Sequence, residues 1–231
     1  MKVGVVVLAG ALRPLGPRKV MSGIVKTPVS APVWLGSTGL ENDSQGDTRN
    51  HGGPEKAALH YSLDHYAAWR AEIGDAAPLA GPGGFGENFS SSGLTENDVA
   101  VGDIFRIGGA RIQVSQGRQP CWKLNARFDV DDMARRVQNT GRTGWYYRVL
   151  EPGRVEPQDE LELLDRAAPE WTISRLLRIF YRDTLNRDEL AGMANLTVLA
   201  HPWRTRAKKR LESGRVEDWS PRLWGKEEPA R

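Results

Sequence analysis

The sequence of 231 residues contains a single cysteine, Cys121. One cysteine cannot form a disulfide within the chain, and it excludes iron–sulfur clusters and zinc sites that are held by four cysteines. Long apolar runs are also missing, since residues 3–12 reach only about half the length of a membrane span. No G-x-G-x-x-G motif follows a predicted strand, as binding of a flavin or nicotinamide nucleotide would require. Any electron chemistry must therefore use an externally supplied cofactor.

Charge of one sign does not dominate either. Lysine and arginine number 32 and the acidic residues 29, which gives a net charge of +3. A dedicated nucleic-acid binder would carry a dense basic stripe. Residues 3–12 are shorter than the roughly 15–30 residues of a signal peptide, so we interpret them as a buried first strand. We therefore expect a cytoplasmic protein, with a secreted one as the alternative.

Glycine is distributed unevenly, with 22 of the 25 glycines in residues 1–164. Glycine-rich sequence with short apolar runs predicts strands and turns. Residues 105–107 and 110–115 flank a Gly-Gly pair and predict a hairpin. Further predicted elements are strands at 20–26, 33–35, 99–101 and 161–164, a turn from Pro54 to residue 59, and helices at 63–73 (after Ser62) and 130–138. We expect a mostly antiparallel, barrel-like β domain with interspersed helices.

The last third of the chain predicts three helices. Thr172 can cap a helix over residues 173–181, and Asn186 or Asp188 opens a second one through residue 194. Pro202 begins a third helix over residues 203–213, which Gly214 ends. The domain prediction is therefore a β domain at residues 1–165 and a three-helix domain at residues 166–231.

Three segments have compositions typical of a functional site, and one of them contains Cys121. A lone cysteine is often a small buried hydrophobe, but cations such as Arg118 and Lys123 nearby stabilise the thiolate, which is a nucleophile and metal ligand. The glycines at 52–53 and 83–86 either expose backbone amides to an anion such as phosphate or only form tight turns.

Histidine and basic residues leave two further interpretations open. His60 and His65 lie five apart, not the four that place two zinc ligands on one helix face, so only a scattered His/His/Cys zinc site remains. Residues 203–211 carry five cations and are either a nucleic-acid recognition helix or a solvated basic helix face.

The three segments, in order, resemble the MOSC-domain proteins of the YiiM type. They are HGGPEKAALHY, GFGENFSSSGLTENDVAVGDIF and IQVSQGRQPCWKLN, and further similarity lies in MSGIVKTPV, NTGRTGWYYRVLEPG and EDWSPRLWGK. The similarity covers nearly the whole chain. It implies a MOSC-type β-barrel followed by a small three-helix domain.

The resemblance also implies a bound molybdenum cofactor, a pterin dithiolene that holds molybdenum. Carried onto this chain, the family's cysteine makes Cys121 the catalytic residue and the molybdenum ligand, in keeping with the softness of a thiolate. The candidate cofactor-binding residues are Tyr61, Ser62, Gly86, Glu87, Asn88, Gln116, Arg118 and Lys123. Gly86 stands where mitochondrial relatives have an arginine, so Arg118, Lys123 or Arg142 must meet the phosphate charge.

The implied reaction is reduction of an N-hydroxylated compound to the amine and water. The substrates it implies are 6-N-hydroxylaminopurine, amidoximes and hydroxamic acids, which indicates a role in detoxification. Glu87 or His51 can supply a proton, and electrons must come from a separate reductase. Membrane and nucleic-acid partners are not expected, whereas a homodimer is compatible with the sequence. The alternatives are a sulfur carrier that uses a Cys121 persulfide and a nucleic-acid-binding module that uses residues 203–210.

Overall fold

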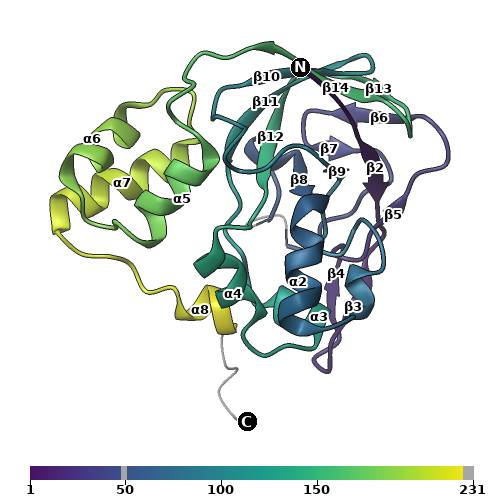
Figure 1. Ribbon diagram of the computed structural model, residues 1–231, viewed down its shortest axis with the longest axis horizontal. Helices are drawn as coiled ribbons and strands as arrows, with labels where there is room; N and C mark the ends of the chain where they lie inside the picture. Colours follow the sequence, from purple (N-terminus) through teal and green to yellow (C-terminus); the bar gives the residue numbers. More distant parts are fainter. Residues whose placement is uncertain (48–50, 226–231) are drawn as a thin grey trace.

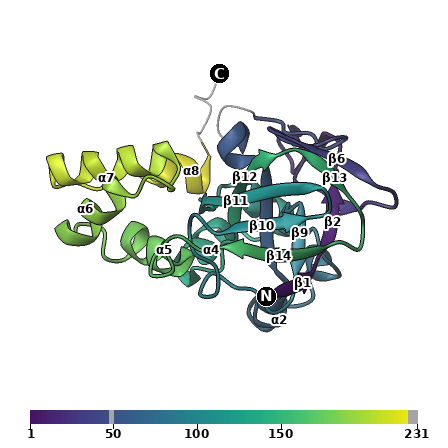
Figure 2. The ribbon, with the colours of Figure 1, turned by 90° about the horizontal axis from the view of Figure 1, so that it is seen from above.

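The computed structural model describes residues 1–47 and 51–225. Most of the first 165 residues form a rolled sheet with short helices packed on it, and the helices of the last part lie to one side (Figures 1 and 2). The sheet-rich fold with interspersed helices and a C-terminal helical region is the one that the sequence predicts. The division at residue 165 stays a prediction, because one hydrophobic cluster contains residues from both parts.

Within residues 1–47 and 51–225, nine strands make up the main sheet. In sheet order they are β1 (Lys2–Gly4), β14 (Glu160–Asp165), β10 (Ile104–Ile107), β11 (Ala110–Gly117), β12 (Trp145–Glu151), β8 (Ala58–Ser62), β9 (Phe89–Ser91), β2 (Val6–Ala9) and β5 (Thr27–Pro28). All neighbouring pairs are antiparallel except β8 and β9, which are parallel. The hydrogen-bonded order of these strands is open, so the predicted β-barrel does not close into a ring. The sheet is nevertheless rolled, because β1 and β2 are separated only by Val5 yet pair with strands near opposite ends of the order.

Two smaller sheets complete the strand content of the described chain. One contains β13 (Gly153–Val155), β6 (Val33–Gly36) and β7 (Gly39–Leu40), and the other contains β3 (Arg13–Leu15) and β4 (Val20–Ser22). The predicted hairpin is confirmed as β10 and β11, joined at Gly108, whose φ of 52° suits a residue without a side chain. Ile112 and Val114 of β11 are fully buried in the sheet's core. Residues 99–101 form only an isolated bridge between Ala100 and Thr172.

The central strand β8 is the main difference from the sequence prediction. The helical turn that starts at Pro54 ends at Lys56 as the 3-10 helix η1 (Pro54–Lys56), and β8 follows at once. All five residues of β8 are buried. A strand that is buried on both faces lacks the apolar–polar alternation by which a strand is normally recognised.

Helices in the first part pack around a second, smaller core. They are η2 (Leu63–His65), α2 (Tyr66–Ile73), η3 (Ala77–Leu79), α3 (Lys123–Phe128) and α4 (Met133–Thr140). Ser62 caps η2 by accepting a hydrogen bond from the Asp64 amide at 3.3 Å, as its sequence position predicts. The second core contains Tyr61, Phe85 and Leu124 together with Leu223 from near the end of the described chain.

The three predicted C-terminal helices are confirmed as α5 (Ile173–Tyr181), α6 (Arg187–Asn195) and α7 (His201–Ser213). Thr172 caps α5, Asn186 caps α6, and Gly214 ends α7 in the left-handed conformation. A further short helix that was not predicted, α8 (Ser220–Trp224), lies beside α4 (Figure 1). Among the residues described, no helix is long and apolar enough to cross a membrane.

Candidate functional site

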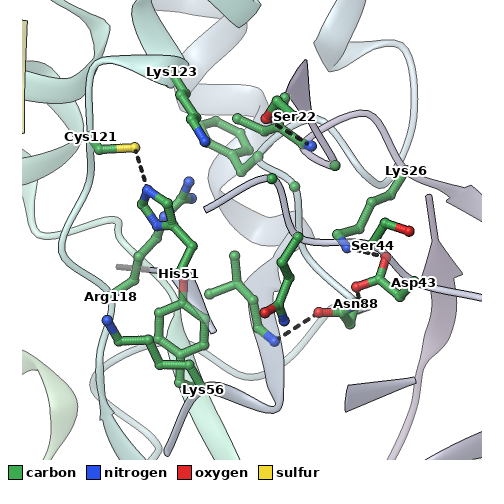
Figure 3. A pocket seen from close by; sticks show the side chains of 18 residues that line it. Ser22, Lys26, Asp43, Ser44, His51, Lys56, Asn88, Arg118, Cys121 and Lys123 are labelled. Atoms are coloured by element: carbon green, nitrogen blue, oxygen red, sulfur yellow. Dashed lines mark hydrogen bonds and ion pairs between the residues drawn. The ribbon is translucent and has the colours of Figure 1, made fainter. Parts of the chain in front are cut away.

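A pocket opens where β8, the end of β11 and several loops converge (Figure 3). Residues that line it come from segments far apart in the sequence: Ser22, Gly23, Ile24, Lys26, Asp43, Ser44, Gln45, Gly46, His51, Lys56, Leu59, Phe85, Gly86, Asn88, Arg118, Cys121, Lys123 and Tyr146. Five of the nine predicted site residues are in this set: Gly86, Asn88, Arg118, Cys121 and Lys123. The fold therefore brings the cysteine segment and the glycine-rich segment to one pocket.

Cys121 lies between the end of β11 and the start of α3, with 8% of its surface exposed. Its Sγ atom is 3.6 Å from Nε2 of His51, and Figure 3 shows the two side chains directed toward each other at one side of the pocket. Burial by itself would raise the pKa of the thiol. The contact with His51, the Arg118 guanidinium and the backbone amide of Lys123 oppose burial and lower the pKa to about 7. A large fraction of Cys121 is therefore thiolate at neutral pH.

At the opposite side of the pocket, Lys26 and Asp43 form a buried ion pair between Nζ and Oδ1 (Figure 3). Burial lowers the pKa of Lys26, although the charge and hydrogen bond of Asp43 oppose this. The other Asp43 oxygen, Oδ2, accepts a hydrogen bond from Asn88 Nδ2 at 2.9 Å. Asn88 Oδ1 in turn accepts from the Leu59 amide at 3.1 Å, so Asn88 joins this pair to β8.

Positive charge dominates the lining. Among the described residues that line the pocket, four have cationic side chains, Lys26, Lys56, Arg118 and Lys123, and one, Asp43, has a carboxylate. Burial, followed by the nearby charge of Arg206, lowers the pKa of Lys56. Such a pocket favours an anionic ligand.

Arg118 provides the most direct indication of a missing anionic partner. Arg118 is 5% exposed, and its buried Nη1 has no hydrogen-bond partner within the described part of the chain. A buried cationic donor that lacks a partner is costly. A phosphate oxygen in the pocket would satisfy it.

The glycine-rich loop at residues 83–88 presents its backbone to the pocket. Gly86 has a φ of 80°, and a Cβ atom there would come within 2.8 Å of Ile24 Cγ1, so no larger residue fits without displacement. The structure gives Glu87, a predicted cofactor contact and proton source, a different task. Its carboxylate accepts hydrogen bonds from the amides of Gly83 (2.7 Å) and Phe85 (2.9 Å) and from the Tyr66 hydroxyl (3.0 Å). Glu87 therefore stabilises the conformation of the loop and does not line the pocket.

The remaining predicted residues, Tyr61, Ser62 and Gln116, are not among the residues that line the pocket. Tyr61 stacks on Phe85 with ring centroids 3.9 Å apart and donates its hydroxyl hydrogen to the Arg142 carbonyl at 3.1 Å. Ser62 serves as the cap of η2. Gln116 is 1% exposed, and its Oε1 has no partner among the residues that the structure describes. Tyr61 therefore supports a residue that lines the pocket, Phe85, whereas Ser62 supports the start of η2.

Arg142, predicted as a cation for the phosphate, lies outside the lining. Its guanidinium pairs with Glu72 and lies over the Trp69 ring, 3.8 Å from the centroid. The other two predicted cations, Arg118 and Lys123, do line the pocket, together with Lys26 and Lys56, which were not predicted. Lys26 and Lys56 lie in the segments MSGIVKTPV and HGGPEKAALHY, which resemble the family. Their place in these segments is the sequence feature that could have identified them.

Tyr146 of β12 was also missed. It lines the pocket, and the Lys56 ammonium lies 6.0 Å from its ring centroid. Burial raises the pKa of Tyr146, so its phenol stays protonated at neutral pH. The segment at 145–151 was not predicted as a strand, and nothing local in the sequence indicates that residue 146 faces Cys121.

The pocket fits a soft-metal cofactor that carries an anionic group better than a zinc ion. Throughout the described residues, no three histidine, cysteine, aspartate or glutamate side chains gather as a metal site. One thiolate at one side, with the buried cations Arg118 and Lys123 lining the same pocket, instead provides a single soft ligand and an anion subsite.

The chain is similar to known proteins over most of its length. A family model described as "MOSC domain" matches residues 47–162, and one described as "YiiM-like, 3-alpha helix domain" matches residues 171–214. The chain is 42% identical over 205 residues to "Protein YiiM" from Escherichia coli (strain K12), covering 89% of this chain and 91% of that protein. The crystal structure of YiiM from Escherichia coli matches with a TM-score of 0.82 and 38% identity, covering 97% of this chain and 100% of that one. A protein named "Reductase" from Gibberella moniliformis (strain M3125 / FGSC 7600) is 34% identical over 196 residues, which cover 84% of this chain and 35% of that protein.

Proposed function

The chain belongs to the family of MOSC-domain, YiiM-like proteins, and from this premise we propose that it is a molybdenum-cofactor-dependent reductase of N-hydroxylated compounds. The observation that carries the proposal is the buried Cys121 thiol, whose pKa is lowered to about 7, in a pocket lined by four cations. The reductase named among its relatives supports the reaction class.

Cys121 would hold the molybdenum, and the cations would hold the pterin phosphate. Arg118 is the first candidate for the phosphate because its buried Nη1 lacks a partner among the residues described. Lys123 lines the same pocket, and the backbone at Gly86 allows close approach. When bound, the cofactor supplies the two-electron redox chemistry of the conversion.

The overall conversion is R–NHOH + 2 e⁻ + 2 H⁺ → R–NH₂ + H₂O, so two protons must reach the substrate. We assign proton delivery to His51 rather than Glu87. His51 lies in the pocket beside Cys121, whereas both Glu87 oxygens accept hydrogen bonds from amides of the glycine-rich loop. Tyr146 provides an aromatic ring in the same pocket, which suits a planar substrate such as a hydroxylaminopurine.

Electrons would come from a separate reductase. The chain has one cysteine and no nucleotide-binding motif after a strand, so it has no internal relay. The protein with cofactor and NADH alone should therefore not reduce 6-N-hydroxylaminopurine, whereas a chemical donor such as reduced methyl viologen should support the reaction. Turnover with NADH alone by the purified protein would contradict the need for a partner.

The decisive test is molybdenum content after production in a host that makes the cofactor. We expect about one molybdenum per chain in the wild type and its loss in Cys121→Ala, since no other soft ligand lines the described pocket. Lys208→Ala, on the exposed face of α7, is the matched control and should retain the metal. Full molybdenum in Cys121→Ala would refute the ligand assignment. A wild type without molybdenum that carries sulfane sulfur on Cys121 would instead favour a sulfur carrier.

A further inference from the structure

The short helix α8 packs on the segment that carries Cys121 and also contacts the end of α5. Leu223 is 6% exposed and belongs to the second core, together with Leu124 and Phe128 of α3. The Leu223 carbonyl accepts a hydrogen bond from Asn125 Nδ2 at 3.0 Å. The family model for the helical region ends at residue 214, so α8 lies beyond it.

Arg222 of α8 binds the peptide groups on both sides of Cys121. Its Nη1 donates to the carbonyl of Pro120, the residue before the cysteine. Its backbone carbonyl accepts from the amide of Trp122, the residue after the cysteine, at 2.8 Å. One residue therefore restrains the backbone on either side of the thiol.

Further contacts fix the Arg222 side chain in this position. Nη2 donates to Oε1 of Gln138, a buried residue of α4. The guanidinium carbon lies 5.7 Å from the ring centroid of Tyr181 at the end of α5. The side chain thus spans the space between α4, α5 and the cysteine segment.

The connection from α7 to α8 is anchored as well. Glu217, between the two helices, accepts two hydrogen bonds from Arg210 at 2.9 and 3.0 Å, and the Arg210 side chain is 1% exposed. Arg210 also donates to the Phe180 carbonyl at 3.0 Å. The chain leaves the three helices at this ion pair, in which only Arg210 is buried, and returns to the β domain at α8, as Figures 1 and 2 show.

We propose that Arg222 is a positioning residue that clamps the Cys121 segment, and that this is one function of the C-terminal region of this protein. Without the guanidinium, the peptide before Cys121 loses its restraint and the thiol becomes accessible through local opening. The effect on the thiol depends only on the contacts above, whereas its effect on metal retention rests on the proposed function.

The test uses the full-length, metal-free protein and the rate at which iodoacetamide alkylates Cys121, followed by mass spectrometry. Cys121 is the only cysteine, so the total label reports this site alone. Measurement at about pH 9, above the thiol pKa of about 7, makes the rate report access rather than ionisation. Arg222→Met keeps the aliphatic stem and removes both side-chain hydrogen bonds. Arg215→Met, at an exposed arginine before α8, is the matched control.

We expect Arg222→Met to be alkylated about tenfold faster than the wild type, which corresponds to the loss of roughly 1.4 kcal/mol of local stability. Arg222→Lys can still reach one carbonyl and should restore part of the protection, and Arg215→Met should react at the wild-type rate. A wild-type rate in Arg222→Met would overturn the clamp. An equal increase in Arg222→Met and Arg222→Lys, matched by a fall in global stability by urea denaturation, would also overturn it, because it indicates general destabilisation.

Molybdenum retention separates this proposal from the proposed function. If the wild type binds the metal, Arg222→Met should release it faster during dialysis than Arg215→Met does. If the wild type binds no molybdenum, the proposed function fails while the alkylation rates still decide whether Arg222 holds the cysteine.

Discussion

Replacing Glu87 tests whether this buried carboxylate shapes the pocket or takes part in the chemistry. Glu87 is fully buried, and its two oxygens accept three hydrogen bonds: Gly83 N and Tyr66 Oη donate to Oε1, and Phe85 N donates to Oε2. In Glu87→Ala these three donors lose their acceptor inside the protein. In Glu87→Gln, one oxygen can still serve Gly83 and Tyr66, but an NH₂ group then faces the Phe85 amide.

The magnitudes follow from the number of donors that lose an acceptor. A buried donor without a partner costs about 1–3 kcal/mol, and such costs add incompletely within one network, so Glu87→Ala should lower the free energy of unfolding by about 3 kcal/mol. Glu87→Gln should lower it by about 1–2 kcal/mol, since one hydrogen bond is lost. For a chain of this length, 3 kcal/mol corresponds to a fall of about 6–12 °C in Tm.

Urea denaturation of the metal-free protein, followed by tryptophan fluorescence, measures both variants against the wild type. Glu151→Ala is the control, because Glu151 forms an exposed ion pair with Arg111 that should contribute little. Wild-type stability in Glu87→Ala would refute the structural role. A stable Glu87→Gln that binds molybdenum normally but does not reduce the substrate would show that Glu87 takes part in the reaction.

Three further predictions concern buried ionisable groups. Lys26→Met leaves the Asp43 carboxylate buried without its cation. The free energy of unfolding, measured by urea denaturation, should therefore fall by about 3 kcal/mol. An unchanged free energy of unfolding would show that the pair is not buried in solution. In metal-free protein, the alkylation rate of Cys121 should increase with pH, with a midpoint near pH 7. His51→Ala should move this midpoint to higher pH. A wild-type midpoint at the ordinary thiol value near 8.5 would contradict the His51 contact. Burial lowers the pKa of His60 to about 3 from 6.5, so below about pH 6.5 the unfolded chain takes up a proton that the folded protein does not. The free energy of unfolding should therefore fall by up to about 1.4 kcal/mol per pH unit as the pH is lowered toward 3. The same measurement on His60→Gln is the control. If the wild type loses stability no faster than His60→Gln over this pH range, His60 is not buried as a neutral ring.

Local signals in the sequence determined the C-terminal helices and the hairpin. Thr172 and Asn186 accept hydrogen bonds from amides three residues further on, and Gly214 ends α7 with a backbone conformation that suits glycine. These interactions form within one helical turn, so the sequence next to them contains the whole signal. The same holds for the Gly-Gly turn between β10 and β11.

The cysteine segment was also predictable as a site, because its single cysteine and flanking cations are adjacent in the chain. Arg118 and Lys123 do line the pocket with Cys121. The roles of Glu87 and Arg142 were not predictable, since they depend on which donors and carboxylates the fold places beside them. A side chain of suitable chemistry close to a motif need not point into the pocket.

Only the tertiary structure decided which distant segments meet. The β8 strand looks like the continuation of a helical turn until its pairing with β12 and β9 buries it on both faces. Lys26 and Asp43 become a buried pair, and Arg222 reaches the peptides beside Cys121, only because the chain folds back over 17 and about 100 residues. The sequence by itself determined the chemistry that is available, a lone thiol among cations and glycines, since that depends on composition and near neighbours. Which groups surround the thiol depends on long-range contacts, whose free energy comes from burial and pairing across the whole chain.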